Sequence, residues 1–274
     1  MSSPENPIGS LPPVGSVYTA EPPSPIQTPP KVEDPPWSGW DVLMLIAVTI
    51  GASFLLSMGV VTLVWVLIYK TKSWVDVARI PEVVLLAQLL AYVVVLFVMY
   101  RLVRIRAGAF WQALRWNWPR ERWIGFLLGG GVLFFVLASL GRFLPIPKNL
   151  PIDQFFQTGR EAAIMSIFAV TVAPLMEELF FRGFLYPVLA RRLGMFGGIL
   201  LTSLAFGLLH GGQLKYSWAA VLIIFLVGVA LTTVRALTKS VAASFLLHVG
   251  YNGALSLLMF IGTDGFRHLE KLSQ

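Results

Sequence analysis

Two adjacent glutamates and an arginine, Glu177, Glu178 and Arg182, lie in the apolar stretch MEELFFRGFL and are the residues best suited to chemistry. A charge at membrane depth is costly unless it is paired or hydrated. Residues four apart on a helix share a face, so Glu178 and Arg182 are predicted to form an ion pair. Glu177 then lies about 100° around the helix from Glu178. It is therefore predicted to face away from the ion pair and to be free for chemistry.

The same spacing of four residues occurs twice more, in FGLLH (Phe206 to His210) and HVGYN (His248 to Asn252). Each repeat places its two named residues on one helix face. We expect the two histidines and Glu177 to lie at comparable depths, roughly 12–21 Å from the helix ends at 1.5 Å per residue. Three helices are thus predicted to present polar groups to one buried cavity, with Phe206 forming part of its wall.

A membrane must surround these residues. Of the 274 residues, 56% are hydrophobic and 13% are charged, and the mean hydropathy is +0.74, well above that of a soluble domain. The apolar runs are long enough to cross a core about 30 Å thick and lack the alternation of a lipid-facing barrel. We expect an all-α, polytopic transmembrane bundle of seven spans, or eight if the long fourth divides. The predicted spans are residues 42–69, 82–100, 123–144, 162–190, 196–214, 217–235 and 240–262.

Proline and glycine positions refine this picture. Pro174 removes a backbone hydrogen bond just before the glutamates and is predicted to bend the fourth span, and Pro187 can do so again. Small residues are expected where helices pack closely, at glycines 129–131, 211, 212, 228, 250 and 253.

Composition also divides the chain into four parts. Residues 1–36 hold 11 of the 18 prolines and are predicted to form a disordered tail. This tail lacks the pattern of a cleavable signal peptide, so the first span is expected to stay as an anchor. We expect N-terminal transmembrane helices and a basic loop over 37–160, a catalytic transmembrane core over 161–262, and a polar tail over 263–274.

The net charge of +7 comes from basic residues at the span ends. The segment 101–122 carries six of them, which is typical of a cytoplasmic loop that meets anionic lipid. We therefore expect the bilayer, and no nucleic acid, as a partner. With seven spans, the N-terminus is predicted to be cytoplasmic and the C-terminus to lie on the opposite side.

Together, Glu177-Glu178-x-x-x-Arg182, Phe206-x-x-x-His210 and His248-x-x-x-Asn252 resemble, in that order, the three motifs of the CAAX protease and bacteriocin-processing family of intramembrane proteases. The family includes the prenyl-protein endopeptidases. The resemblance covers about residues 160–262. It implies an intramembrane endopeptidase that cuts a membrane-associated peptide or protein, and we expect a multi-pass protein of a prokaryotic plasma membrane.

The resemblance also implies roles for four residues. Glu177 would be the general base for water, and His210 would help to orient that water. His248 and Asn252 would stabilise the oxyanion. These roles are chemically coherent, because fixed donors aimed at developing charge can supply a few kcal/mol. Glu178, Arg182 and Phe206 would support the site.

A zinc-dependent mechanism is the alternative. Two carboxylates and two histidines are plausible zinc ligands, and the ligands would then be Glu177, Glu178, His210 and His248. Against zinc, the sequence has no H-E-x-x-H motif, so we expect no cofactor. The absence of cysteine excludes a thiolate nucleophile, and no G-x-S-G motif or aspartate within a span supports a rhomboid or aspartyl protease.

A second class of function uses the same residues. In a transporter, the glutamates and histidines could bind ligand or relay protons, and a non-catalytic scaffold could use them to join helices. Asn252, one turn after His248, favours hydrolysis, because an oxyanion needs hydrogen-bond donors whereas proton relay does not need an amide.

Overall fold

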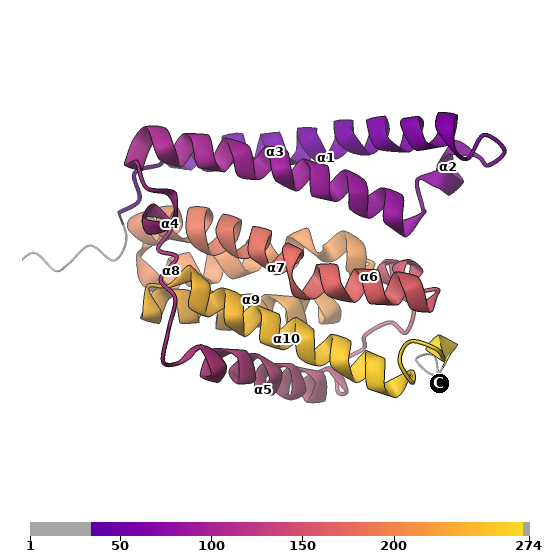
Figure 1. Ribbon diagram of the computed structural model, residues 1–274. Coiled ribbons are helices and arrows are strands. Elements are labelled where there is room, and N and C mark those ends of the chain that lie inside the picture. The colour runs from indigo at the N-terminus through magenta and orange to yellow at the C-terminus, as the bar shows by residue number, and fades with distance from the viewer. Residues whose placement is uncertain (1–33, 271–274) are drawn as a thin grey trace, which may run out of the picture. The chain divides into compact units, whose positions relative to one another are not determined.

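The computed structural model describes residues 34–270, and every regular element in this range is a helix (Figure 1). The long helices are α1 (Gly39–Leu67), α3 (Pro81–Ala107), α5 (Trp123–Gly141), α9 (Trp218–Thr238) and α10 (Val241–Gly262). Between α5 and α9 the chain forms α6 (Gly159–Val170), α7 (Val172–Glu177), η2 (Glu178–Leu185) and α8 (Tyr186–Leu209). The short helices are α2 (Trp74–Val77), α4 (Phe110–Ala113), η1 (Pro151–Phe155) and η3 (Gly211–Leu214).

Six of these helical stretches are long and apolar enough to cross a membrane. Large apolar side chains such as Phe54, Phe97 and Phe135 are more than half exposed on them, as expected for surfaces that face lipid. Over residues 34–270 the protein is therefore all-α, and its six candidate spans indicate a multi-pass integral membrane protein. The sequence predicted seven spans, and the difference arises because two predicted spans, 162–190 and 196–214, lie in one helical run over 159–209.

This run of 51 residues reverses its direction at Gly194. Gly194 has φ 73° and ψ 177°, a conformation that interrupts the helix and that favours glycine because a side chain would be strained there. A Cβ on Gly198 would lie 2.9 Å from the Cα of Ala190. The part of α8 before Gly194 and the part after it therefore pack closely against each other.

The predicted bend before the glutamates is present. Helix α6 ends at Val170 and α7 begins at Val172, so the helix is interrupted at Thr171, which has φ −117° and ψ −72°. Pro174 lacks an N–H to donate to Val170, four residues earlier, and its ring crowds that carbonyl. The next segment, η2, is a π-helix, a rare form that occurs frequently at functional sites. Pro187 stands in the first turn of α8.

Several boundaries differ from those predicted. Helix α3 continues to Ala107, so residues 101–107 of the basic segment are helical, and α4 lies in the same segment. Helix α8 ends at Leu209, where Gly211 and Gly212 follow, so the predicted span 196–214 was too long. Helix α9 extends to Thr238, three residues beyond the predicted end at Arg235, and Arg235 is buried.

Helix α10 is central to the part of the bundle that carries the site, packing against α5, α9, α6 and η2 (Figure 1). A Cβ on Gly130 would collide with the carbonyl oxygen of Leu247, and one on Gly250 with that of Leu127. The expected close packing at these glycines is confirmed. Gly212 and Gly253 make only ordinary contacts. The crossing of α5 and α10 thus fixes the helix that carries His248.

The proline-rich tail was predicted over residues 1–36, and residues 1–33 of it lie outside the described residues. Residues 271–274 also lie outside them. Pro35, near the end of the predicted tail, and Trp37, just after it, lie against the run 159–209. The side chain of Arg191 donates to the carbonyl oxygens of Pro35 and Trp37, at 2.8 and 3.1 Å.

Candidate active site

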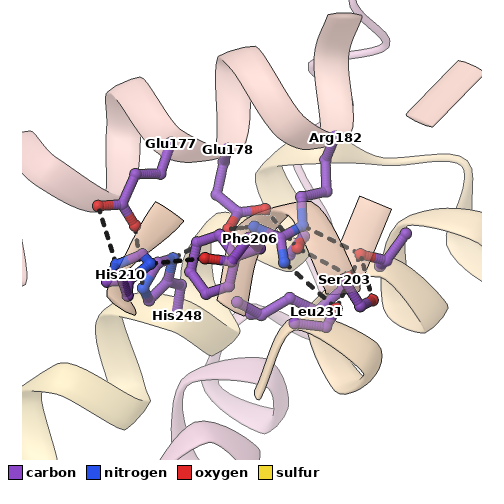
Figure 2. A network of polar contacts seen from close by, with 11 residues as sticks. Glu177, Glu178, Arg182, Ser203, Phe206, His210, Leu231 and His248 are labelled. Atoms are coloured by element: carbon purple, nitrogen blue, oxygen red, sulfur yellow. Dashed lines mark hydrogen bonds and ion pairs between the residues drawn. The ribbon is translucent and has the colours of Figure 1, made fainter. Parts of the chain in front are cut away.

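Glu177, the last residue of α7, faces two imidazoles. Its Oε1 atom is 3.9 Å from Nε2 of His210, and its Oε2 atom is 3.7 Å from Nε2 of His248. Figure 2 shows all three side chains pointing toward one another from different helical segments. The separations exceed a direct hydrogen bond and are of the size that a water molecule can bridge. Glu177 is partly exposed, at 22%.

Glu178 and Arg182 form the predicted ion pair. Nη1 of Arg182 is 2.8 Å from Oε1 of Glu178, and both side chains are 0% exposed. Arg182 also donates from Nε to Oγ1 of Thr232 at 3.3 Å and from Nη2 to the carbonyl oxygen of Gly228 at 3.2 Å. Its guanidinium lies over the ring of Phe206, 4.6 Å from the centroid. Buried charges are tolerated when they are paired and hydrogen-bonded in this way.

Glu178 also holds His248. Its Oε1 atom is 2.9 Å from Nδ1 of His248, and its Oε2 atom accepts a hydrogen bond of 2.6 Å from Ser244. An ionised carboxylate keeps a proton on the nitrogen that faces it, so Nδ1 carries the proton. The opposite nitrogen, Nε2, is thereby directed at Glu177 (Figure 2).

His210 follows the last residue of α8. The sequence analysis had placed it inside the predicted span 196–214, and this placement was wrong. Its Nδ1 atom is 2.7 Å from the carbonyl oxygen of Phe206. A carbonyl oxygen only accepts hydrogen bonds, so Nδ1 carries the proton and Nε2 presents a lone pair to Glu177. The ring of Phe206 lies 4.6 Å from that of His210 and 5.9 Å from that of His248, which makes Phe206 a packing partner of both imidazoles.

Asn252 is on the same helix as His248, one turn further along, and its amide donates to the carbonyl oxygen of Ala169 at 2.7 Å. This bond joins α10 to the end of α6. An asparagine amide has two N–H donors, so one remains for another acceptor.

Sequence reasoning missed the hydroxyl groups of the site. Ser244 lies four residues before His248, so the spacing used for the other pairs could have found it. Thr232, which accepts from Arg182, is also within 3.5 Å of the hydroxyl of Ser203. Nothing in the sequence distinguishes Thr232 from the other hydroxyl residues of apolar helices.

The four zinc ligands proposed as the alternative do not fit this geometry. Both oxygens of Glu178 are engaged, by Arg182, Ser244 and His248. Over residues 34–270, no group of three or more His, Asp or Glu side chains is arranged to hold a metal ion. Glu178 is therefore assigned to the ion pair and to His248.

The helices and this cluster define a multi-pass membrane protein with a carboxylate and two imidazoles converging within the helical bundle. Residues 159–254 match the family described as type II CAAX prenyl endopeptidase Rce1-like. This segment is an Rce1-like domain of that family, and it contains Glu177, His210, His248 and Asn252. The match implies an intramembrane protease that acts on a peptide substrate. No curated protein and no solved structure matches the chain.

Proposed function

We propose that this protein is an intramembrane endopeptidase that hydrolyses a peptide bond of a membrane-associated substrate with a water molecule activated by Glu177. One observation supports this most directly. In a segment that matches a family of endopeptidases, the carboxylate of Glu177 faces the Nε2 atoms of both His210 and His248 at 3.7–3.9 Å.

The first step is water activation. The carboxylate of Glu177 takes a proton from water while Nε2 of His210, a hydrogen-bond acceptor, orients that water. The resulting hydroxide attacks the carbonyl carbon of the scissile bond and forms a tetrahedral oxyanion. Glu177 then returns the proton to the leaving nitrogen as the C–N bond breaks, which leaves a new carboxyl terminus and a new amine.

His248 and Asn252 are proposed to stabilise the oxyanion. Since Nδ1 of His248 already donates to Glu178, this role requires the imidazolium form, in which Nε2 also carries a proton. Asn252 would contribute the amide N–H that is not used by Ala169. Donors that are fixed before the charge develops stabilise it without reorganisation.

A transporter or scaffold would use the same side chains without cutting any bond. The test compares the peptide termini in membranes that contain the wild-type protein with those in membranes that contain Glu177→Ala at the same level. A protease predicts termini that are present with the wild type and absent with the variant. Identical termini would favour the transporter or the scaffold.

Metal removal gives a separate prediction. If Glu177 acts on water without a metal, protein treated with a zinc chelator and desalted should cleave its substrate at an unchanged rate. Elemental analysis should find no stoichiometric metal. Activity that is lost on chelation and regained with zinc alone would overturn this mechanism.

We further propose seven membrane crossings, with the run 159–209 crossing twice. At one end of the bundle, Arg191 contacts Trp37, and the backbone N–H of Val241 donates to the carbonyl oxygen of Arg115. At the other end, Arg160 pairs with Glu82, 3.4 Å apart, and η1 packs on η3. The run 159–209 begins near Arg160 and ends just before η3, and both of these lie at the same end of the bundle. Arg191, close to Gly194 in the middle of the run, lies at the other end. The run therefore crosses from one end of the bundle to the other and returns.

This topology predicts the location of the C-terminus. The segment 101–122 carries six basic residues and is proposed to be cytoplasmic. A reporter fused after Gln274 should therefore be found on the opposite side of the membrane, and a reporter fused before Met1 on the cytoplasmic side. Two cytoplasmic reporters would contradict an odd number of crossings.

A further inference from the structure

Tyr92 places a hydroxyl group near the middle of the 27-residue helix α3, and the proposed mechanism does not use it. Tyrosines of membrane proteins gather at the membrane–water interface, and a polar group deep in an apolar span is costly unless it has a partner. Gln88 lies one helical turn earlier, so it shares a face with Tyr92, and its side chain interacts with the phenol hydroxyl. Helix α3 therefore carries a pair of uncharged polar side chains at membrane depth.

Tyr92 is joined to the part of the site that holds Asn252. Its ring stacks on the ring of Phe168, with the centroids 6.1 Å apart and the two planes at 5°. Phe168 directly precedes Ala169, whose carbonyl oxygen accepts from the amide of Asn252 at 2.7 Å. The stack therefore places the phenol of α3 against the segment of α6 that orients one of the two proposed oxyanion residues.

Tyr92 is also near the proposed general base. It packs against the buried hydrophobic cluster that includes Met176, the residue before Glu177, and its hydroxyl is close enough to Glu177 for the carboxylate charge to act on it. The two imidazoles that Glu177 faces follow α8 and lie on α10, whereas Tyr92 comes from α3. A third helix thus brings a hydrogen-bonding group to the surroundings of the carboxylate.

A substrate peptide that reaches Glu177 carries the polar groups of its own backbone into the bundle. Each N–H or C=O group that finds no partner there is costly, because no bulk water replaces it. A phenol both donates and accepts hydrogen bonds, and an amide side chain has donors and an acceptor. Tyr92 and Gln88 can therefore satisfy such groups without adding a charge, whereas packing on Phe168 would need only the ring.

We propose that Tyr92 is a substrate-binding residue whose hydroxyl, with Gln88 beside it, hydrogen-bonds to the backbone of the substrate next to the scissile peptide bond. This role rests on the proposed hydrolysis and adds to it the side chain that holds the peptide in place. Tyr92 takes no part in the proton transfer, since Glu177 both accepts the proton and returns it.

The test is Tyr92→Phe, which keeps the ring and its stack on Phe168 and removes only the hydroxyl. The substrate is a membrane-anchored peptide taken from the termini that the wild type produces. We expect KM to rise roughly threefold to tenfold, the effect of losing one uncharged hydrogen bond. The value of kcat should change little, because an interaction made equally in the bound substrate and in the transition state affects KM alone. The melting temperature in detergent should also change little.

A second set of substrates identifies the backbone group that Tyr92 contacts. Each has one peptide bond beside the scissile bond replaced by an ester, which removes the N–H and weakens the carbonyl acceptor. With the wild type, one of these esters should raise KM by a similar factor. With Tyr92→Phe, the same ester should cause little further increase, because the hydrogen bond that it weakens is already absent. Residues that act independently would instead give additive effects.

The matched control is Tyr100→Phe, the same change about two turns later in α3. Tyr100 is 44% exposed and its ring lies beside Phe110 and Arg104, so this variant should keep the wild-type KM. If Tyr92→Phe fails to fold, Gln88→Met replaces it and should raise KM in the same direction. An unchanged KM in a folded variant, a loss confined to kcat, or additive effects of ester and substitution would overturn this role alone. Absence of any cleavage by the wild type would overturn the proposed function, and this role with it.

Discussion

Glu177→Gln should reduce cleavage roughly 10²–10⁴-fold, the loss typical of removing a general base. The amide keeps the shape of the side chain but cannot take a proton from water. Glu177 has no bond to Arg182, and it faces the imidazoles across 3.7–3.9 Å, so the fold should be intact. The measurement is the rate of cleavage of a membrane-anchored peptide, taken from the termini that the wild type produces, together with melting in detergent.

The control for this variant is Glu121→Gln, which makes the same change at an exposed glutamate between α4 and α5, and it should cleave at the wild-type rate. No second substitution should restore Glu177→Gln. The assignment of the base would be wrong if Glu177→Gln cleaved normally while folded Glu178→Gln was inactive.

Glu178→Gln should act mainly on stability. The substitution leaves Arg182 buried and without its charge partner, and breaking a fully buried pair costs on the order of 3–5 kcal/mol. Both members are 0% exposed, so water does not replace the lost partner. We expect a lower melting temperature and lower expression, measured in detergent, with a smaller loss of cleavage per folded molecule than Glu177→Gln shows.

The double variant Glu178→Gln/Arg182→Gln should recover part of this stability, because it leaves no unpaired charge in the bundle. Ser244→Ala is a graded control. It removes one hydrogen bond to the carboxylate, worth about 1.5–3 kcal/mol, and leaves the ion pair in place. If the double variant melted below Glu178→Gln, charge pairing would not be the reason for the loss.

The spacing of four residues predicted much of the site. It anticipated the pairing of Glu178 with Arg182, the contact between Phe206 and His210, and the separate direction of Glu177. These are local features of a helix, and they persist although the backbone from Glu178 onward is a π-helix. The π-helix itself was not predictable, because no residue type specifies its extra residue per turn.

Other features depend on contacts between distant segments. The proton on Nδ1 of His248 is set by Glu178, 70 residues away in sequence, and the amide of Asn252 is turned to Ala169, 83 residues away. Hydropathy alone could not predict that His210 follows the end of α8, since the apolar run continues through Leu209 and only the two glycines that follow indicate a boundary. The break at Gly194, in contrast, falls between the predicted spans 162–190 and 196–214.

The most direct test of the proposed hydrolysis is cleavage of the same membrane-anchored peptide in water enriched in ¹⁸O, by the wild-type protein and by Glu177→Gln. Mass spectrometry then measures how fast the new carboxyl terminus appears and whether it carries the label. We expect labelled product from the wild type and a rate at least about 100-fold lower from Glu177→Gln. Labelled product formed by Glu177→Gln at the wild-type rate, or no cleavage product from the wild type, would contradict the proposal that Glu177 activates water for peptide hydrolysis.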